Sequence, residues 1–308
     1  MKVLVTGGAG FIGSHVVDKL IEQEHQVIVV DNLSTGKEIN LQNNIKLINI
    51  DVSSSELSNV FEEHQPEIVI HLAAQINVNK SIQNPKLDAE TNILGTINIL
   101  EHCRKHKIKK IIYAASAAQF GNPQYLPIDE NHPFQPLSPY GLSKSVVESY
   151  LKLYSRLYNL NHTILRYANV YGPRQNSDAE GGVIAIFSQQ SLNNQQLSIF
   201  GDGKQTRDFI YVEDVAEATV LMLNKGNNQI YNLGSGKEIS LNNLINLFKD
   251  ILQKDISLNY VEARKGDIKK NYYSIEKIKN ECSFLPKINL KEGLTKTINY
   301  FKNLQSHK

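Results

Sequence analysis

Short apolar runs alternate with longer segments of helical period in the first half of the chain. The runs that predict strands are residues 3–6, 26–30, 45–50, 67–71 and 110–114. The segments that predict helices are residues 11–23, 56–64 and 88–106. Strands that are apolar throughout are typical of a parallel sheet covered by helices on both faces. Since crossovers between parallel strands are almost always right-handed, the pattern predicts a doubly wound α/β sheet.

The second half continues this alternation with less regularity. Further strands are predicted at residues 162–167, 209–212 and 229–233, and further helices at residues 138–158, 213–223, 240–253, 274–282 and 290–304. The stretch 172–208 is rich in Gly, Asn, Gln and Asp and has weaker periodicity. We therefore predict a larger domain made of residues 1–168 with 209–234, and a smaller C-terminal α/β domain made of residues 169–208 with 235–308.

The composition is that of an ordinary globular protein and excludes several classes. Of 308 residues, 41% are hydrophobic and 21% are charged, which excludes a disordered chain, a collagen and a coiled coil. The net charge of +2 gives no basic excess, so we do not expect nucleic acid as the main ligand. No apolar run approaches the ~20 residues of a membrane span, and the start lacks a signal-peptide pattern. Cys103 and Cys282 have no metal-ligand spacing, so we expect reduced thiols, a cytoplasmic location and no metal.

A glycine loop directly follows the first predicted strand and opens a helix. Gly7 permits a tight turn, Gly10 lets the backbone approach a pyrophosphate, and Gly13 allows close helix packing. Phe11 and Ile12 lie between the last two glycines. Asp31 ends the second strand, where its carboxylate would accept hydrogen bonds from a ribose and repel a 2′-phosphate. The loop therefore predicts a Rossmann-type domain that binds NAD rather than NADP, with a glycine-rich turn and a solvated aspartate as the alternative.

Other strand ends offer further candidate cofactor contacts. Ligands bind at the carboxyl ends of the strands in such sheets. The small residues after the fourth strand would leave room for the cofactor. Each candidate alone would fit ordinary packing or a helix cap, so their shared position carries the prediction. These candidates are Asn32, Asp51, Val52, Leu72, Ala73, Ala74, Gln75, Asn92 and Tyr167.

A tyrosine and a lysine stand one helical turn apart at Tyr140 and Lys144. A second pair with this spacing, Tyr273 and Lys277, is far from the dinucleotide half, so we interpret Tyr273 as a surface or core residue. A phenol with a pKa of ~10 must lose about three pKa units, or roughly 4 kcal/mol, to act as a base near neutrality. A nearby ammonium and a cationic nicotinamide both favour the phenolate. Ser116 follows the fifth strand, and its hydroxyl could bind the oxygen that Tyr140 deprotonates.

The chain contains, in order, the motifs TGGAGFIG, HLAAQ, ASAAQFG, YGLSK, RYANVYGPRQ and GDGKQTRDFIYVEDVA. Together they resemble the extended short-chain dehydrogenase/reductase family, its NAD-dependent epimerase/dehydratase group, and most closely the UDP-glucose 4-epimerase branch of that group. The resemblance implies tightly held NAD, a nucleotide sugar in the C-terminal domain and a homodimer formed through two helices of each subunit. It implies that Ser116, Tyr140 and Lys144 are catalytic. Tyr140 would take the proton of the sugar 4-hydroxyl while carbon 4 gives a hydride to NAD, and the 4-keto sugar would turn over before both return.

The same resemblance implies residues for the nucleotide sugar. Asn169, Arg207 and Arg264 would reach the diphosphate, Asp267 would hold the nucleotide ribose, and Val183 would contact the substrate. Surface ion pairs are the alternative for the two arginines. Asn271 resembles the place where a bulky tyrosine excludes N-acetyl sugars, although a shift of one residue would put Tyr272 there instead.

Two alanines separate this chain from relatives with other reactions. The family that the motifs resemble also contains dehydratases and decarboxylases, which carry acidic side chains directly after the position of Ser116. Here these positions are Ala117 and Ala118. Alanine cannot move a proton, so simple 4-epimerisation of UDP-glucose and UDP-galactose is favoured, with UDP-N-acetylhexosamines as further substrates. The alternatives are a UDP-glucuronate 4-epimerase, another NAD-dependent nucleotide-sugar reductase or dehydratase, and a non-catalytic NAD-binding regulator. A reductase or dehydrogenase would exchange its cofactor in each cycle.

Overall fold

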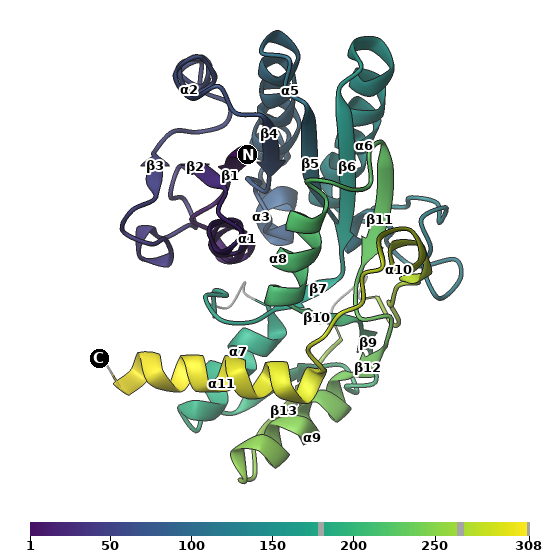
Figure 1. The fold of residues 1–308 in the computed structure, drawn as a ribbon. Helices are drawn as coiled ribbons and strands as arrows, with labels where there is room; N and C mark the ends of the chain where they lie inside the picture. Colours follow the sequence, from purple (N-terminus) through teal and green to yellow (C-terminus); the bar gives the residue numbers. More distant parts are fainter. Residues whose placement is uncertain (178–181, 264–267, 307–308) are drawn as a thin grey trace.

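The main sheet has seven parallel strands, and it confirms the predicted doubly wound fold (Figure 1). The computed structural model describes residues 1–177, 182–263 and 268–306. The strand order is β11-β6-β5-β4-β1-β2-β3, and every neighbouring pair runs parallel. The order reverses direction beside β1, which is where such sheets bind ligands. The strands are β1 (Lys2–Thr6), β2 (Gln26–Val30), β3 (Lys46–Ile48), β4 (Ile68–His71), β5 (Lys110–Ser116), β6 (Asn161–Tyr167) and β11 (Gln229–Leu233).

Helices cover both faces of this sheet, which is why its strands are apolar throughout. One face is buried by α1 (Phe11–Glu22), α8 (Val212–Leu221) and α10 (Glu276–Cys282). The other is buried by α2 (Leu57–His64), α5 (Gly95–Lys105) and α6 (Pro139–Tyr158). Successive side chains of a strand point to opposite faces. Accordingly, Val3 and Val5 belong to the first core and Leu4 to the second.

The predicted helix over residues 88–106 starts earlier and is not uniform. It begins as α4 (Pro85–Ala89), where the Asn84 side chain accepts from the Leu87 amide, passes through a π-helical turn (Glu90–Leu94) and continues as α5. A further short helix, α3 (Val78–Gln83), precedes it. Gly95 follows the π turn, and a Cβ there would lie 2.9 Å from a Val52 methyl carbon, so the helix passes close to the loop after β3.

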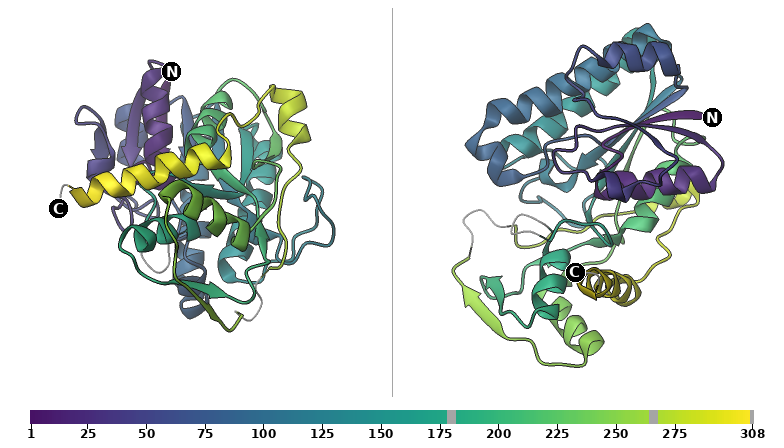
Figure 2. Two further views of the ribbon diagram at one scale, coloured as in Figure 1. Left: turned by 90° about the horizontal axis from the view of Figure 1, so that it is seen from below. Right: turned by 90° about the vertical axis from the view of Figure 1, so that its left-hand side faces the viewer.

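The smaller lobe lies below the main sheet in Figure 1 and in the right-hand view of Figure 2. It has a hydrophobic core of its own. Its helices are α7 (Val183–Leu192), α9 (Leu241–Leu252) and α11 (Leu290–Ser306). Its strands pair as β7 (Asn169–Tyr171) with β10 (Phe209–Tyr211), β9 (Thr206–Arg207) with β12 (Ile239–Ser240), and β8 (Leu197–Phe200) with β13 (Leu258–Val261). The predicted strand at 209–212 therefore pairs with β7 instead of joining the main sheet. None of the helices described is long and apolar enough to cross a bilayer.

Candidate active site

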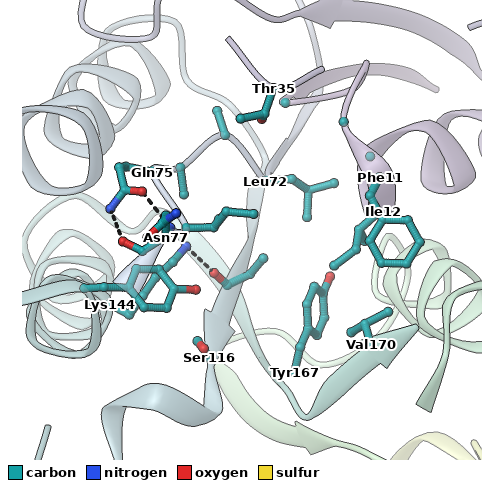
Figure 3. Close-up of a pocket in the computed structure, with 18 of the residues that line it drawn as sticks. Phe11, Ile12, Thr35, Leu72, Gln75, Asn77, Ser116, Lys144, Tyr167 and Val170 are labelled. Atoms are coloured by element: carbon teal, nitrogen blue, oxygen red, sulfur yellow. Dashed lines mark hydrogen bonds between the residues drawn. The ribbon is translucent and has the colours of Figure 1, made fainter. Parts of the chain in front are cut away.

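A cavity of about 670 Å³ lies at the carboxyl ends of the main-sheet strands and is lined by residues of both lobes. Figure 3 shows part of this lining. A volume of this size suits a small-molecule ligand or cofactor. The cavity brings together most of the predicted site residues. These are Gly7, Gly10, Phe11, Ile12, Gly13, Asp31, Asn32, Asp51, Val52, Leu72, Ala73, Ala74, Gln75, Ser116, Tyr140, Lys144, Tyr167, Asn169 and Val183.

The glycine loop is shaped by close backbone contacts. Gly7 has a φ of +71°, and a Cβ there would lie 2.6 Å from the Ala73 nitrogen at the end of β4. A Cβ at Gly13 would lie 2.0 Å from the Gly7 carbonyl oxygen. Gly10 is the N-cap of α1 and offers no side-chain cap for the first amides of the helix, and the residues of this first turn line the cavity. A helix N-terminus of this kind favours a phosphate group.

Asp31 directly follows β2 and lies against the glycine loop. The residue is 7% exposed, and its carboxylate accepts hydrogen bonds from the Ala9 amide and the Leu33 amide, each at 2.9 Å. These bonds hold the side chain against the glycine loop at the end of β2. A carboxylate can accept more than two hydrogen bonds, so Asp31 retains capacity for ribose hydroxyls.

The next strand end carries a second oriented carboxylate. Asp51 accepts from the Ser53 amide at 2.8 Å, from the Ser53 hydroxyl at 2.6 Å and from the Asn32 side-chain amide at 2.6 Å. Burial acts to raise the pKa of Asp51, but these hydrogen bonds outweigh it and hold the pKa below its usual range. Asp51 is therefore ionised at neutral pH and ties Asn32 to the rim of the cavity.

Lys144 lies within the cavity and is largely buried. Its ammonium donates to the Ala114 carbonyl at 2.9 Å and lies 4.8 Å from the centroid of the Tyr113 ring. Burial lowers the pKa of Lys144 to about 8, while the charge of Asp88 acts to raise it.

A serine cap sets the start of α6, because the Ser138 hydroxyl accepts from the Gly141 amide at 3.1 Å. The helix cap therefore fixes where Tyr140 and Lys144 project.

Tyr140 lies next to Ser116 at the cavity wall. Burial raises the pKa of Tyr140 above its usual value, and its interaction with the Ser116 hydroxyl opposes that shift. Ser116 Oγ in turn accepts from the Ala118 amide at 3.2 Å. The phenol therefore stays protonated near neutral pH until more positive charge enters the cavity. A cation beside the ring would supply that charge.

Two predicted site residues lie away from the cavity. Asn92 is buried in the π turn, where its amide oxygen accepts from the Gln75 backbone amide at 2.8 Å, so it supports the cavity wall from behind. Arg207 donates to the Thr206 and Ile268 carbonyls at 2.8 and 2.6 Å, which turns its guanidinium toward the backbone. Arg264 and Asp267 lie outside the described residues.

Some cavity-lining residues have no counterpart among the sequence predictions. They include Ser34, Thr35, Asn77, Lys80, Gln175 and Phe209. Lys80 lies in α3, which had no recognisable helical signal. Thr35 follows Asp31 in an irregular loop, where residue type alone gives no position. The site of Asn271, by contrast, is buried and is not among the lining residues of this cavity.

Comparisons with known proteins agree with this geometry. The model of the NAD dependent epimerase/dehydratase family matches residues 3–234. A Methanocaldococcus jannaschii protein that carries UDP-glucose 4-epimerase as a provisional name is 50% identical over 302 residues, which cover 98% of each chain. The structure of UDP-glucose 4-epimerase from Thermotoga maritima with UDP-glucose has a TM-score of 0.97 and 44% identity, and the match covers 99% of this chain and 100% of that one. UDP-N-acetylglucosamine 4-epimerase from Methanobrevibacter ruminantium, in complex with UDP-N-acetylmuramic acid, has a TM-score of 0.94 and 36% identity over 98% of each chain. The family resemblance predicted from the motifs is confirmed.

Proposed function

Because the chain belongs to the NAD-dependent epimerase/dehydratase family, we propose that it interconverts the 4-epimers of a UDP-sugar, with UDP-glucose and UDP-galactose as the principal pair. One observation carries the proposal: a single cavity holds the glycine loop together with Ser116, Tyr140 and Lys144. A proton-transfer group and a dinucleotide-binding loop therefore share one space. Ala117 and Ala118 stand where a dehydratase needs acidic side chains, which favours epimerisation.

The residues of the cavity fit NAD. The glycine loop and the amide end of α1 would hold the pyrophosphate, and Asp31 would accept from the adenosine ribose. Lys144 would hold the nicotinamide ribose once it leaves the Ala114 carbonyl. When bound, NAD would take up a hydride from carbon 4 of the sugar and return it to the same carbon, and it would also supply the positive charge that favours the phenolate form of Tyr140.

Each of three residues would have its own role in the proton transfer: Tyr140, Ser116 and Lys144. Tyr140 would take the proton of the 4-hydroxyl and later return it, because its hydroxyl lies at the cavity wall beside Ser116. Ser116 would hold the same sugar oxygen by a hydrogen bond. Lys144 would favour the phenolate by its charge. Both directions of the reaction use the same residues, so no further acid is required.

We assign the two ligands to the two lobes. Residues 1–168 with 209–234 would hold NAD, and residues 169–208 with 235–308 would hold the nucleotide sugar. Two elements cross this division, because β10 pairs with β7 of the smaller lobe and α10 packs on the main sheet. Asn169 on β7 and Val183 at the start of α7 support this division, because both belong to the smaller lobe and line the cavity that the glycine loop also lines. UDP-N-acetylhexosamines are a second substrate class, which the similarity to the Methanobrevibacter ruminantium enzyme favours.

A substrate comparison tests the proposed reaction. The purified protein is incubated without added NAD with UDP-glucose, UDP-N-acetylglucosamine or UDP-glucuronate, and products are resolved by chromatography. We expect UDP-galactose from UDP-glucose, and NAD released from the denatured protein. Turnover of UDP-glucuronate alone would contradict the hexose assignment. A strict need for added NAD in each cycle would instead indicate a reductase.

Replacing Asp31 by Asn is expected to weaken NAD binding by roughly 10–100-fold. The substitution removes a charged hydrogen-bond acceptor, and such bonds contribute about 1.5–3 kcal/mol. Discrimination against NADP should fall as well, since the charge that repels a 2′-phosphate is gone. Titration calorimetry with both nucleotides measures this. Asp202→Asn, an exposed carboxylate in the smaller lobe, is the control. Unchanged NAD affinity in a folded Asp31→Asn variant would contradict the assigned role.

We also propose that the protein is a homodimer formed through α5 and α6. Large apolar side chains are exposed along these helices, which supports a covered face. Leu142 and Leu157 on α6 are 53% and 59% exposed, and Leu94, the last residue of the π turn that leads into α5, is 56% exposed. A second copy of the same surface would bury them in a symmetric contact.

Replacing Leu157 by Glu is expected to shift the dimer to monomer at micromolar concentrations, because a charge would be buried in the apolar contact. Sedimentation velocity measures the change. Leu285→Glu, which alters a residue that is 50% exposed outside these helices, should leave the dimer intact. A wild-type protein that sediments as a monomer would contradict the proposed interface.

A cytoplasmic location is part of the same proposal. Cys103 and Cys282 are buried free thiols, and burial raises the pKa of Cys103 far above its usual value. Thiols that persist in this form are typical of a reducing compartment.

A further inference from the structure

Two opposite charges are buried beside the active site without touching each other. Asp88 on α4 is 1% exposed and Lys144 on α6 is 4% exposed. Among the described residues, neither forms an ion pair within 4.0 Å. Lys144 donates to the Ala114 carbonyl, and the side-chain donors to Asp88 within the described part of the chain are the neutral amides of Gln75 and Asn92. An uncompensated charge in the interior is costly, so each of these groups needs a counter-charge in its surroundings.

A chain of hydrogen bonds joins Asp88 to the start of α6. Asp88 Oδ1 accepts from the side-chain amide of Gln75 at 2.9 Å and from that of Asn92 at 3.1 Å. Asn92 also donates to Ser143 Oγ at 3.1 Å, and Ser143 donates to the Tyr140 carbonyl at 3.0 Å. In Figure 3, Gln75 and Lys144 lie on the same side of the pocket. The carboxylate therefore holds one wall of the cavity against the helix that carries Tyr140 and Lys144.

The other titratable groups around Lys144 do not supply a free negative charge. Tyr113 on β5 and Tyr140 on α6 stay protonated, because burial raises the pKa of both. His71 on β4 is neutral, since burial lowers its pKa to about 3. Glu148, one turn further along α6, is bound by Arg166 through two hydrogen bonds at 2.8 and 2.9 Å. Among these described groups, Asp88 is the carboxylate left to balance the ammonium.

We propose that Asp88 is a positioning residue of the active site: it is the counter-charge of Lys144, and it ties the cavity wall at Gln75 to the first turns of α6. The consequence for catalysis rests on the proposed function. Asp88 keeps Lys144 charged as a ligand for the cofactor ribose, and the same negative charge acts against the Tyr140 phenolate. The base would therefore form only when positive charge enters the cavity. The charge pairing itself needs no substrate or cofactor.

Titration of Lys144 in the cofactor-free protein tests the pairing. The chain is labelled with ¹³Cε-lysine, and the Lys144 signal is identified by its loss in Lys144→Met. In Asp88→Asn the pKa of Lys144 should fall by at least about half a unit below that of the wild type, because the attractive charge is removed. Lys110 is a control within the same spectra. It is also buried with a pKa of about 8, it binds the Met222 carbonyl at 2.6 Å, and it should titrate unchanged.

An unmoved Lys144 titration in folded Asp88→Asn would overturn the proposal. Asp214→Asn, which alters a buried carboxylate that accepts from the Lys287 and Ile288 amides, controls for general loosening and should not move Lys144. The proposal would also be overturned if the pKa values of Lys144 and Lys110 shifted together, or if the pKa of Lys144 shifted equally in Asp214→Asn.

A stability comparison covers the case in which Asp88→Asn does not fold well. If Asp88→Asn lowers the free energy of unfolding because Lys144 is left without a counter-charge, the double variant Asp88→Asn/Lys144→Met should be more stable than Asp88→Asn alone. A double variant no more stable than Asp88→Asn would overturn the pairing. Neither measurement depends on epimerase activity. Failure of the proposed function would instead show as absent turnover in a protein whose Lys144 still responds to Asp88.

Discussion

Replacing Tyr140 by Phe is expected to lower kcat for 4-epimerisation by roughly 10²–10⁴-fold, the usual contribution of a positioned acid–base group. The substitution removes the hydroxyl that would exchange the proton and keeps the ring that fills the cavity wall. Ser116 and Lys144 remain in place, and Lys144 keeps its bond to the Ala114 carbonyl. Binding of NAD should change much less than kcat. Steady-state assays with UDP-glucose and calorimetry with NAD separate the two effects.

The chain contains a matched control for this experiment. Tyr273 has the same spacing to Lys277 as Tyr140 has to Lys144, and it is fully buried, with only a long 3.5 Å bond from its hydroxyl to the Tyr167 carbonyl. Tyr273→Phe should leave kcat within a few-fold of the wild type. Equal activity in Tyr140→Phe and the wild type would eliminate the proposed proton transfer. An equal loss in both variants would point to a general packing effect instead.

Replacing Glu148 by Ala is expected to destabilise the protein by about 3–5 kcal/mol. The carboxylate and Arg166 are 1% and 3% exposed at their side chains and form two parallel hydrogen bonds. Removing the carboxylate leaves the guanidinium buried without its counter-charge. It also frees Gln119, which donates to Glu148 at 2.8 Å from the turn after Ser116. Urea unfolding followed by circular dichroism measures the loss.

Two comparisons isolate the cause of that loss. Glu101→Ala breaks an Arg–Glu contact with Arg104 that lies at the surface, with side chains 43% and 44% exposed, and should cost far less. The double variant Glu148→Leu/Arg166→Met removes both buried charges and should regain part of the stability lost in Glu148→Ala. A Glu148→Ala protein as stable as the wild type would show that the Glu148–Arg166 pair makes no net contribution to the free energy of unfolding.

The parallel sheet was predictable because burial on both faces leaves a strong signal. All seven main-sheet strands correspond to apolar runs, and the cofactor half of the site follows from where those runs end. The glycine loop was equally informative, since close backbone contacts at Gly7 and Gly13 exclude other side chains. The ends of the predicted strands and the glycine loop therefore located much of the cofactor side of the cavity lining.

The smaller lobe was less predictable because its elements are short and depend on contacts distant in sequence. The pairs β9–β12 and β8–β13 join segments more than thirty residues apart through two to four residues each. The helix α7 opens with the apolar run Val183–Ile184–Ala185–Ile186–Phe187, so it shows little contrast between its faces. The orientation of Asn92 and Arg207 depended on neighbours that no local pattern reveals. Both have the expected residue type, yet neither is among the lining residues of the cavity. Asn92 holds the Gln75 backbone from behind the cavity wall, and Arg207 donates to the Thr206 and Ile268 carbonyls.

The two bonds that Asp31 makes to its own loop bear on any attempt to redesign nucleotide choice. The side chain that would discriminate between cofactors also anchors the Ala9 and Leu33 amides. An engineer who installs a basic residue at this position to recruit NADP would lose that anchor in the same step. A workable redesign would therefore restore the lost acceptor from a neighbouring position, such as Ser34 or Thr35, before altering the charge.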